Sequence, residues 1–284
     1  MNYNDITISL VLFKSEKVVF KCLKSINKVK KIIIFDNSND KELKKIINNK
    51  YPNIKYILSK KNIGYGAAHN KVSKLADTPY VFVLNPDTIL HKDCIKELVI
   101  SSKKLKNNFS IISPLSTPKN YGYFDNSYEK RIVSKNFIDV DFVKGFSMLI
   151  KISKTNYFDH NFFLYLEEID LCKRLKKRKE KIFIVKKSKI KHLAAKSSNI
   201  GFEFEKCRNW HWMWSKVYYD IKYKNYFYAI KKVFFTILLS YIKGILFLLL
   251  DKDKSTISFL RSSGAMNALI GKRSWYRPKI NNIY

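Results

Sequence analysis

Acidic residues are scarce in this chain: Asp and Glu together number 23, against 55 Lys and Arg, and the formal net charge at pH 7 is +32. Such a charge attracts anions, so nucleic acid, an anionic membrane surface and phosphorylated substrates are the partner classes to weigh. Lys far outnumbers Arg, and Ile and Asn are abundant, which also fits a biased genome composition. The charge therefore points to an anionic partner without choosing among the three classes.

Paired cysteines and several recognisable motifs are also lacking. The four cysteines are scattered with no C-x-x-C pair, which argues against a disulfide framework or a zinc site and indicates a reducing cytoplasm. The stretch LVLFKSEK has no glycine-rich phosphate loop, which argues against a sugar nucleotidyltransferase. No helix-turn-helix or zinc-finger pattern supports a nucleic-acid-binding protein. The N-terminal MNYNDITISLVLF has no basic segment or cleavage site, so we expect a first strand there and not a signal peptide.

Apolar strands and helices alternate through the first part of the chain. Hydrophobic residues make up 46% of the sequence, which is ample for a sizeable core. Near-continuous apolar strands separated by helices predict a mostly parallel α/β sheet flanked by helices. The predicted strands are 6–13, 31–35, 54–58, 80–84 and 182–185, and the predicted helices are 16–26, 41–48, 67–76 and 162–175. Between them, residues 139–152 predict a strand, a turn at Gly145 and another strand.

The composition changes near residue 201, where aromatic residues and Lys become dominant. We therefore expect a domain over residues 1–200 and a helical, basic and aromatic extension over residues 201–284. Residues 233–250 read VFFTILLSYIKGILFLLL, slightly short of the roughly 20 apolar residues of a spanning helix and interrupted by Lys243. The basic flanks and aromatic residues suit association with a membrane surface, and the alternative is a buried helix pair that closes the domain.

Two predicted strands end in acids, Asp36 after KIIIF and Asp87 after YVFVL. In open α/β sheets ligands bind beyond the carboxyl ends of the strands, so a nucleotide-like ligand is a natural interpretation. Taken singly, each acid also fits a simple turn, because the dipeptides Asp-Asn and Asn-Pro are both common in turns.

A third group of acids, Glu167, Glu168 and Asp170, lies within FFLYLEEIDLCKRL. On a helix, residues two apart point to opposite sides, so Glu168 and Asp170 are expected on different faces. Residues three apart share a face, so Glu167 and Asp170 are expected on the same one. The three cannot all address one substrate. The alternative is that they stabilise the positive end of a helix or form salt bridges with nearby Lys and Arg.

Seven stretches in order resemble the family 2 glycosyltransferases with the GT-A fold, especially the rhamnosyltransferase-like branch. They are ISLVLFKSE, IIIFDNSND, NIGYGAAHN, VFVLNPDT, VDFVKGFSMLI, FFLYLEEIDLCKRL and the later His192, and together they cover roughly residues 6–198. The resemblance implies a GT-A (Rossmann-like) sheet with a C-terminal helical extension that associates with a membrane.

On the donor side, the resemblance implies that Asp36 contacts the nucleotide base, with Asp40 in the following loop; helix capping is the alternative for both. Asn62 and Gly64 belong to the loop-to-helix segment beside the donor, where a helix N-terminus favours phosphate. NPDT takes the place of the family's DxD motif. Asp87 then helps to hold a divalent cation, Mg²⁺ or Mn²⁺, and Asn85 is left to hydrogen-bond ribose or diphosphate.

On the acceptor side, Glu168 takes the position of the family's general base, where Asp is usual, so the geometry of this longer acid is open. Gly145 resembles an acceptor-side turn, with a hairpin turn as the alternative. Glu167 is also placed on the acceptor side. His192 is expected near the metal or the acceptor, and a structural role is its alternative.

The implied reaction is the inverting transfer of a sugar, with rhamnose suggested by the branch, from a dTDP- or UDP-sugar to a hydroxyl of a glycan acceptor. We expect the acceptor to be lipid-linked, the process to be O-antigen or related surface polysaccharide synthesis, and the enzyme to be peripheral at the cytoplasmic face of an anionic membrane. An inactive scaffold of the same fold is an alternative, and nucleic acid is not an expected partner.

Overall fold

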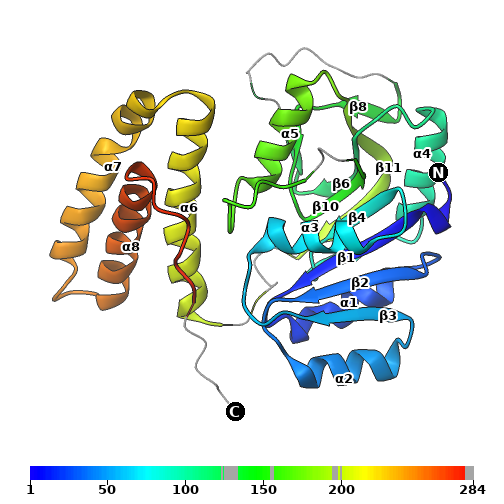
Figure 1. Ribbon diagram of the computed structural model, residues 1–284, viewed down its shortest axis with the longest axis horizontal. Helices are drawn as coiled ribbons and strands as arrows, with labels where there is room; N and C mark the ends of the chain where they lie inside the picture. Colours follow the sequence, from blue (N-terminus) through cyan, green and yellow to red (C-terminus); the bar gives the residue numbers. More distant parts are fainter. Residues whose placement is uncertain (123, 125–133, 154–156, 194–197, 199, 279–284) are drawn as a thin grey trace. The chain divides into compact units, whose positions relative to one another are not determined.

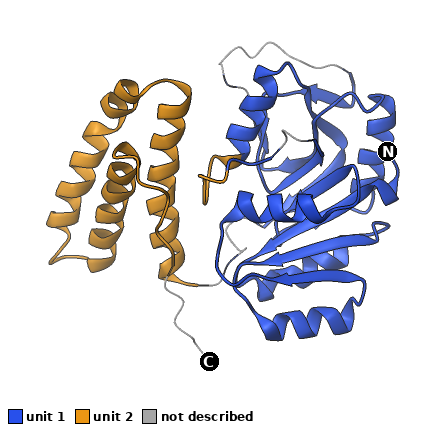
Figure 2. Cartoon of the chain, in the orientation of Figure 1, with its two compact units in different colours: residues 1–159, 168–199 blue, residues 160–167, 200–284 orange. Residues whose placement is uncertain are grey.

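The computed structural model describes residues 1–122, 124, 134–153, 157–193, 198 and 200–278. Contacts divide the chain into unit 1, Met1–Asp159 with Glu168–Asn199, and unit 2, His160–Glu167 with Ile200–Tyr284 (Figure 2). The chain therefore makes a short excursion into unit 2 before it returns to unit 1. The sequence shows no sign of this excursion, and the division into a domain over residues 1–200 and an extension over residues 201–284 stays a prediction.

Unit 1 is built on a single large mixed sheet, in the order β3-β2-β1-β4-β10-β6-β11-β5, with β8 paired to β11 (Figure 1). The strands are β1 (Ile6–Leu12), β2 (Lys31–Asp36), β3 (Ile54–Leu58), β4 (Tyr80–Leu84), β5 (Thr88–Leu90), β6 (Ile111–Thr117), β8 (Phe137–Asp139), β10 (Ser147–Lys151) and β11 (Ile182–His192). Every residue of β1 and β4 is buried, as expected for central strands that are covered on both faces.

Helices cover both faces of this sheet, because each has an apolar stripe at helical spacing. They are α1 (Glu16–Ser25), α2 (Lys41–Lys50), α3 (Tyr65–Leu75), α4 (Cys94–Lys104) and α5 (Glu167–Lys177), preceded by the short 3₁₀ helix η1 (Tyr3–Asp5). Val19, Leu43 and Leu98, from α1, α2 and α4, share one core cluster, whereas Val72 of α3 and Leu171 of α5 belong to clusters of their own. The predicted α/β fold of a mostly parallel sheet between helices is confirmed.

The strand register brings one set of strand ends to a common edge. β1 pairs in parallel with β2 and β4, so that Leu12 lies opposite Asp36 and Leu10 opposite Leu84. β10 runs antiparallel to β4 and begins at that edge, with Ser147 opposite Leu84. β11 runs parallel to β6 and ends beside β5, where His192 lies opposite Thr88. The residues that follow β2 and β4, precede β10 and end β11 therefore share one edge.

Two local expectations are wrong. Gly145 is not a hairpin turn, because β9 (Phe142–Val143) pairs with β7 (Tyr121–Gly122) in a separate small sheet, while β10 joins the large one. The helix expected from residue 162 begins later, at Glu167, because Tyr165 and Leu166 have left-handed φ values of 71° and 67°. Residues other than Gly and Asn rarely adopt this conformation, which does not occur within a right-handed α-helix. The helix therefore begins only after Leu166.

Unit 2 contains three long helices, α6 (Phe202–Tyr223), α7 (Tyr226–Leu246) and α8 (Lys252–Leu269). α8 packs against both of the others, and the shared core includes Trp210 of α6, Val233 of α7 and Ala265 of α8. The interpretation of residues 233–250 as part of a buried helix pair is wrong in part, because α7 buries only Ala229, Val233, Ser240 and Gly244. Among the described residues, no helix has the length and apolar character needed to cross a membrane.

We expect Gly264→Ala to destabilise the protein, because a Cβ at this position of α8 would collide with the backbone carbonyl oxygen of Trp210. Ala normally favours a helix over Gly by about 1 kcal/mol, so a loss can only reflect the collision with α6. The expected decrease in the free energy of unfolding is about 2 kcal/mol, measured by urea denaturation.

Gly271→Ala is the matched control for this substitution. Gly271 has a φ of 70° and open space around it, so only backbone strain of about 1 kcal/mol applies. A Gly264→Ala protein that is as stable as the original would show that α6 and α8 do not approach so closely.

Candidate active site

The shared sheet edge of unit 1 gathers most of the residues expected to act on a ligand. Asp36 ends β2, Asn85 and Asp87 follow β4, Gly145 precedes β10, and His192 ends β11. In open α/β sheets this is the edge where ligands bind.

Asp36 is fully buried and organises the loop that follows β2. Its Oδ1 accepts hydrogen bonds from the backbone N–H and the hydroxyl of Ser38, and its Oδ2 accepts them from the N–H of Asp40 at 2.8 Å and the Tyr56 hydroxyl at 3.1 Å. Burial, with the Asp36 charge as the next cause, raises the pKa of Tyr56, which keeps this phenol a donor. Asp40 caps α2 by accepting from Leu43 at 2.9 Å, so the capping alternative is observed for Asp40. Contact of Asp36 with a nucleotide base stays a prediction.

The NIGYG segment forms a tight loop before α3. Gly64 has a φ of 89° and precedes the first residue of the helix, which explains why a glycine stands there. Asn62 Oδ1 accepts from the Gly64 N–H at 3.0 Å, and Asn37 spans the loop by donating to the Gly64 carbonyl and accepting from Ile63. The predicted loop residues Asn62 and Gly64 are therefore held against the end of β2 through Asn37, a residue that the sequence patterns left without a role.

Asp87 and His192 come together at the end of β4 and β11. Asp87 is buried, and its Oδ1 lies 3.3 Å from Nε2 of His192. The imidazole is stacked on Phe146, with ring centroids 4.1 Å apart and planes at 11°. Asp87 and His192 therefore lie close together, and a shared metal site stays a prediction. Phe146, directly after Gly145, packs on the imidazole of His192. The G-F pair in VKGFS is the only sequence signal for it.

Asn85 is fixed by its backbone, while part of its side chain is left available. Its N–H donates to the Phe146 carbonyl at 3.0 Å, and its own carbonyl accepts from the Thr88 hydroxyl at 2.7 Å. The side-chain Oδ1 is buried and accepts no hydrogen bond from the residues that the structure describes. A buried carbonyl oxygen without a donor is costly, so this atom suits a ligand's hydroxyl group or a cation.

The donor set at this edge fits a divalent cation. Carboxylate and carbonyl oxygens suit Mg²⁺ and Mn²⁺, and imidazole suits the softer transition metals. Asp87, His192 and the Oδ1 of Asn85 would supply part of a coordination sphere, and a cation of this kind commonly takes its other ligands from substrate phosphates and water. No group of three or more His, Cys, Asp or Glu side chains capable of holding a metal was found in the described parts of the chain.

Glu168 lies against Gly145 at the start of α5. A Cβ built on Gly145 would lie 3.5 Å from Cβ and 3.6 Å from Cγ of Glu168, and 3.5 Å from the ring of Tyr65. The Tyr65 hydroxyl donates to the Gly145 carbonyl at 2.8 Å, which ties α3 to this turn. Alanine would just fit at this position, and any larger side chain would displace Glu168 or Tyr65.

Burial raises the pKa of Glu168. The backbone N–H groups of Glu168, Ile169 and Gly145 and the charge of Lys144 oppose this shift without cancelling it. A carboxylate with a raised pKa binds a proton more readily, which is the property required of a general base that works near neutral pH.

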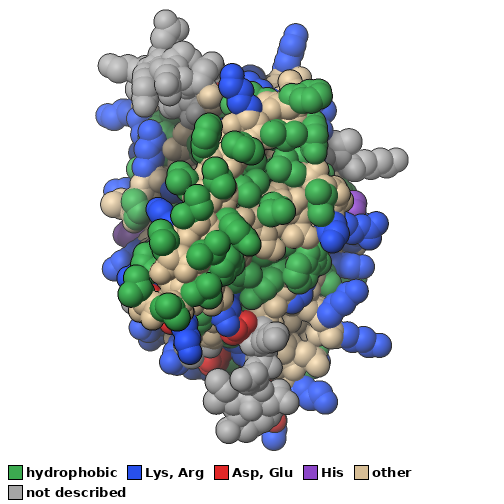
Figure 3. Space-filling model, turned by 90° about the vertical axis from the view of Figure 1, so that its left-hand side faces the viewer, with side chains coloured by type: hydrophobic (Ala, Val, Ile, Leu, Met, Phe, Trp, Pro, Cys, Tyr) green, Lys and Arg blue, Asp and Glu red, His purple; other side chains and the backbone are tan. Residues whose placement is uncertain are grey.

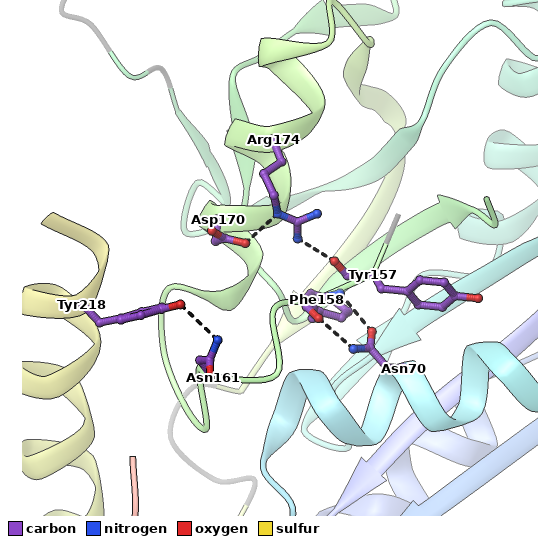
Figure 4. Close-up of polar contacts among 7 residues, drawn as sticks. All are labelled: Asn70, Tyr157, Phe158, Asn161, Asp170, Arg174 and Tyr218. Atoms are coloured by element: carbon purple, nitrogen blue, oxygen red, sulfur yellow. Dashed lines mark hydrogen bonds and ion pairs between the residues drawn. The ribbon is translucent and has the colours of Figure 1, made fainter. Parts of the chain in front are cut away.

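The segment before Glu168 is held by reciprocal hydrogen bonds within unit 1 (Figure 4). Asn70 of α3 donates to the Phe158 carbonyl at 2.8 Å and accepts from the Phe158 N–H at 2.9 Å. Arg174 of α5 donates to the Tyr157 carbonyl and pairs with Asp170 at 2.8 Å. These contacts secure the chain on both sides of the base, and the sequence patterns assign no role to Asn70.

The three acids of α5 have different environments in the structure. Asp170 is buried in the salt bridge with Arg174, so the structural alternative for this residue is observed. Glu167 is buried and is the last residue of the excursion into unit 2, where burial raises the pKa of Tyr165 and the charge of Glu167 adds a smaller contribution. The structure brings only Glu168 to Gly145, and an acceptor-side role for Glu167 stays a prediction.

Comparison with known proteins gives a consistent result. The family model described as glycosyl transferase family 2 matches residues 7–183. A low-salt glycan biosynthesis hexosyltransferase, Agl10 of Haloferax volcanii, is 29% identical over 61% of this chain and 62% of its own length. The rhamnosyltransferase WbbL of Escherichia coli is 28% identical over 59% of this chain and 75% of its own length. The chain thus spans less than two thirds of the first of these relatives.

Two solved structures share the fold at low sequence identity. The mannosyltransferase PcManGT from Pyrobaculum calidifontis, in complex with GDP-Man and Mn²⁺, has a TM-score of 0.56 at 10% identity and covers 93% of this chain and 87% of its own. GalNAc-T7 with UDP, GalNAc and Mn²⁺ has a TM-score of 0.55 at 14% identity and covers 66% of this chain and 43% of its own. Both support the GT-A fold.

We expect Glu168→Gln to flatten the dependence of stability on pH. A carboxyl whose pKa is raised on folding binds more protons in the folded protein, so its contribution to stability is lost as pH rises from its unfolded value toward its folded value. Going from pH 4.5 to pH 7, the original protein should therefore lose more free energy of unfolding at this site than Glu168→Gln does.

Urea denaturation at both pH values provides the measurement, and Glu42→Gln on the exposed side of α2 is the control. Equal pH slopes in the original protein and in Glu168→Gln would contradict the raised pKa of Glu168.

Proposed function

The chain belongs to glycosyl transferase family 2, and we propose that it transfers a hexose from a nucleotide-diphosphate sugar to a hydroxyl group of a glycan acceptor, with inversion at the anomeric carbon. The observation that carries this proposal is the position of Glu168. It is a carboxylate with a raised pKa, placed against a bare glycine backbone beside the edge that carries Asp87 and His192.

Glu168 acts as the general base in this mechanism. It takes the proton from the acceptor hydroxyl as that oxygen attacks the anomeric carbon, while the bond to the departing nucleoside diphosphate breaks. Gly145 leaves room for the acceptor to approach, because its backbone presents no side chain beside the carboxylate. Attack from the side opposite the leaving group gives the inverted product.

The donor is held at the end of β2 and β4. We assign the loop organised by Asp36 to the nucleotide, the N-terminus of α3 after Gly64 to phosphate, and Asn85 to ribose or diphosphate. Asp87 and His192 would hold a divalent cation, Mg²⁺ or Mn²⁺, and the two solved structures of this fold described above contain Mn²⁺. Bound there, the cation would neutralise charge that develops on the departing diphosphate.

The acceptor and its location form the finer part of the proposal. A relative that acts in glycan biosynthesis and a rhamnosyltransferase relative support a glycan acceptor, with rhamnose from a dTDP-sugar as one donor to test beside UDP-sugars. The net charge of +32 favours a diphosphate-linked lipid acceptor at the cytoplasmic face of a membrane, as in O-antigen or related surface polysaccharide assembly.

Glu168→Gln should lower kcat by about 10²- to 10⁴-fold, because it removes the proton acceptor while it preserves the shape of the side chain. Affinity for the nucleotide sugar should change little, since the donor binds at the other strand ends. The assay is a screen of dTDP-, UDP- and GDP-sugars for transfer and hydrolysis with Mg²⁺ and Mn²⁺. Transfer by Glu168→Gln at the original rate would refute the assignment of the base.

Asp87→Asn should instead weaken donor binding in the presence of metal by about tenfold or more, because an amide provides no charge to the cation. Isothermal titration with the donor found in the screen, with and without Mn²⁺, measures this effect. Asp77→Asn is the matched control, since Asp77 is exposed and pairs with Lys31 at 2.7 Å, away from the sheet edge that carries Asp87. An Asp87→Asn protein with unchanged metal-dependent affinity would remove Asp87 from the cation site.

A further inference from the structure

The outer side of α7 carries a continuous exposed apolar face. Phe227, Phe234, Phe235, Leu238, Ile242 and Ile245 are each between 42% and 81% exposed. At about 100° per residue these six form one stripe about 100° wide that runs along the helix. Hydrophobic side chains gather over this face in Figure 3. The outer face of α7, defined by these six residues, is left uncovered by the parts of unit 2 that the structure describes.

The opposite side of α7 holds the helix firmly in unit 2. Its buried positions include Ala229, Ser240 and Gly244, and such small side chains allow close helix packing. A Cβ on Gly244 would lie 2.7 Å from the ring of Phe259, and the Ser255 hydroxyl donates to the Gly244 carbonyl at 2.7 Å. The helix therefore displays its apolar face from a fixed support.

The turn after α7 extends this exposed surface. Leu249 is 98% exposed and Leu250 is 79% exposed, which is unusual for two consecutive leucines at a helix end. Asp251, the next residue, caps α8 and pairs with Lys254 at 3.1 Å. The first acid beyond the apolar surface is thus already engaged with its own helix.

Lysines lie within and beside the apolar face. Lys231 falls in the stripe near its N-terminal end, and Lys243 falls about 80° beyond its edge by the same helical geometry. Both are exposed. Their long stems can lie along an apolar surface while the ammonium groups reach an anionic layer. Lys243 interrupts the hydrophobic run in the sequence, but on the folded helix it belongs to the flank.

We propose that the outer face of α7 and the turn at residues 248–250 dock on an anionic lipid bilayer, with α7 lying in the plane of the interface. Docking of this face on a membrane is inferred from the residues of α7 themselves. It rests on the proposed function only in that docking would bring the enzyme to a lipid-linked acceptor. Apolar side chains flanked by lysines match the acyl and phosphate layers of such a membrane. Two copies of a chain with a net charge of +32 repel each other, which disfavours a second copy as the occupant.

The test is flotation of the full chain with phosphatidylcholine vesicles, with and without phosphatidylglycerol. We expect binding to the anionic vesicles, and a loss of about tenfold in affinity for each of Phe235→Gln and Leu249→Gln. Ile46→Gln is the matched control, because Ile46 is 53% exposed on α2 of unit 1. Circular dichroism confirms that each variant folds.

Three outcomes would overturn the docking proposal. The first is the absence of binding to anionic vesicles, and the second is equal binding by both variants and the original protein, which would leave only nonspecific charge. The third is a dimer in light scattering that the two variants abolish. Donor hydrolysis measured without vesicles separates this result from the enzymatic proposal, since it depends on the sheet edge of unit 1 and not on α7.

Discussion

Strand β10 runs antiparallel between β4 and β6, and its first residue, Ser147, lies opposite Leu84 at the edge where the parallel strands end. This pairing places the turn at Gly145 and Phe146 beside the residues that follow β4. Phe146 then stacks on His192, and Gly145 receives Glu168 from α5. Without the reversed strand, Gly145 and Phe146 would not lie beside the residues that follow β4.

Several of the acids in this basic chain lie where their charge is used by neighbouring groups. Asp36 organises a loop, Asp87 contacts His192, Asp170 pairs with Arg174, and Asp40 caps a helix. Buried carboxylates are stable only when hydrogen bonds or opposite charges compensate for lost hydration. Glu168 differs from these because burial dominates its environment and raises its pKa. Above its unfolded pKa, such a group lowers the stability of the folded protein.

The parallel core was predictable from the sequence because each buried strand reads as a continuous apolar run, and 54–58 and 80–84 match β3 and β4 in full. The positions of Asp36, Asp87 and Glu168 followed from motif order. The late start of α5 did not, because Tyr165 and Leu166 look like ordinary members of a hydrophobic helix face. The strand, turn and strand around Gly145 were predictable, but the failure of the hairpin alternative was not, because pairing of the two strands in different sheets depends on distant residues. The two hydrogen bonds between Asn70 and Phe158 also join segments far apart in sequence, so no local pattern predicts them.

The side chain of Glu168 packs against the turn at Gly145. Its Cγ, the methylene by which Glu exceeds Asp, lies 3.6 Å from where a Cβ of Gly145 would stand, which is an ordinary packing distance. The backbone N–H groups of Glu168 and Ile169, at the start of the helix, and of Gly145, at the turn, oppose the rise in the pKa of this carboxyl that burial causes. The helix start and the turn after β9 therefore act together on this one acid, although they are separated in the sequence and no local pattern relates them.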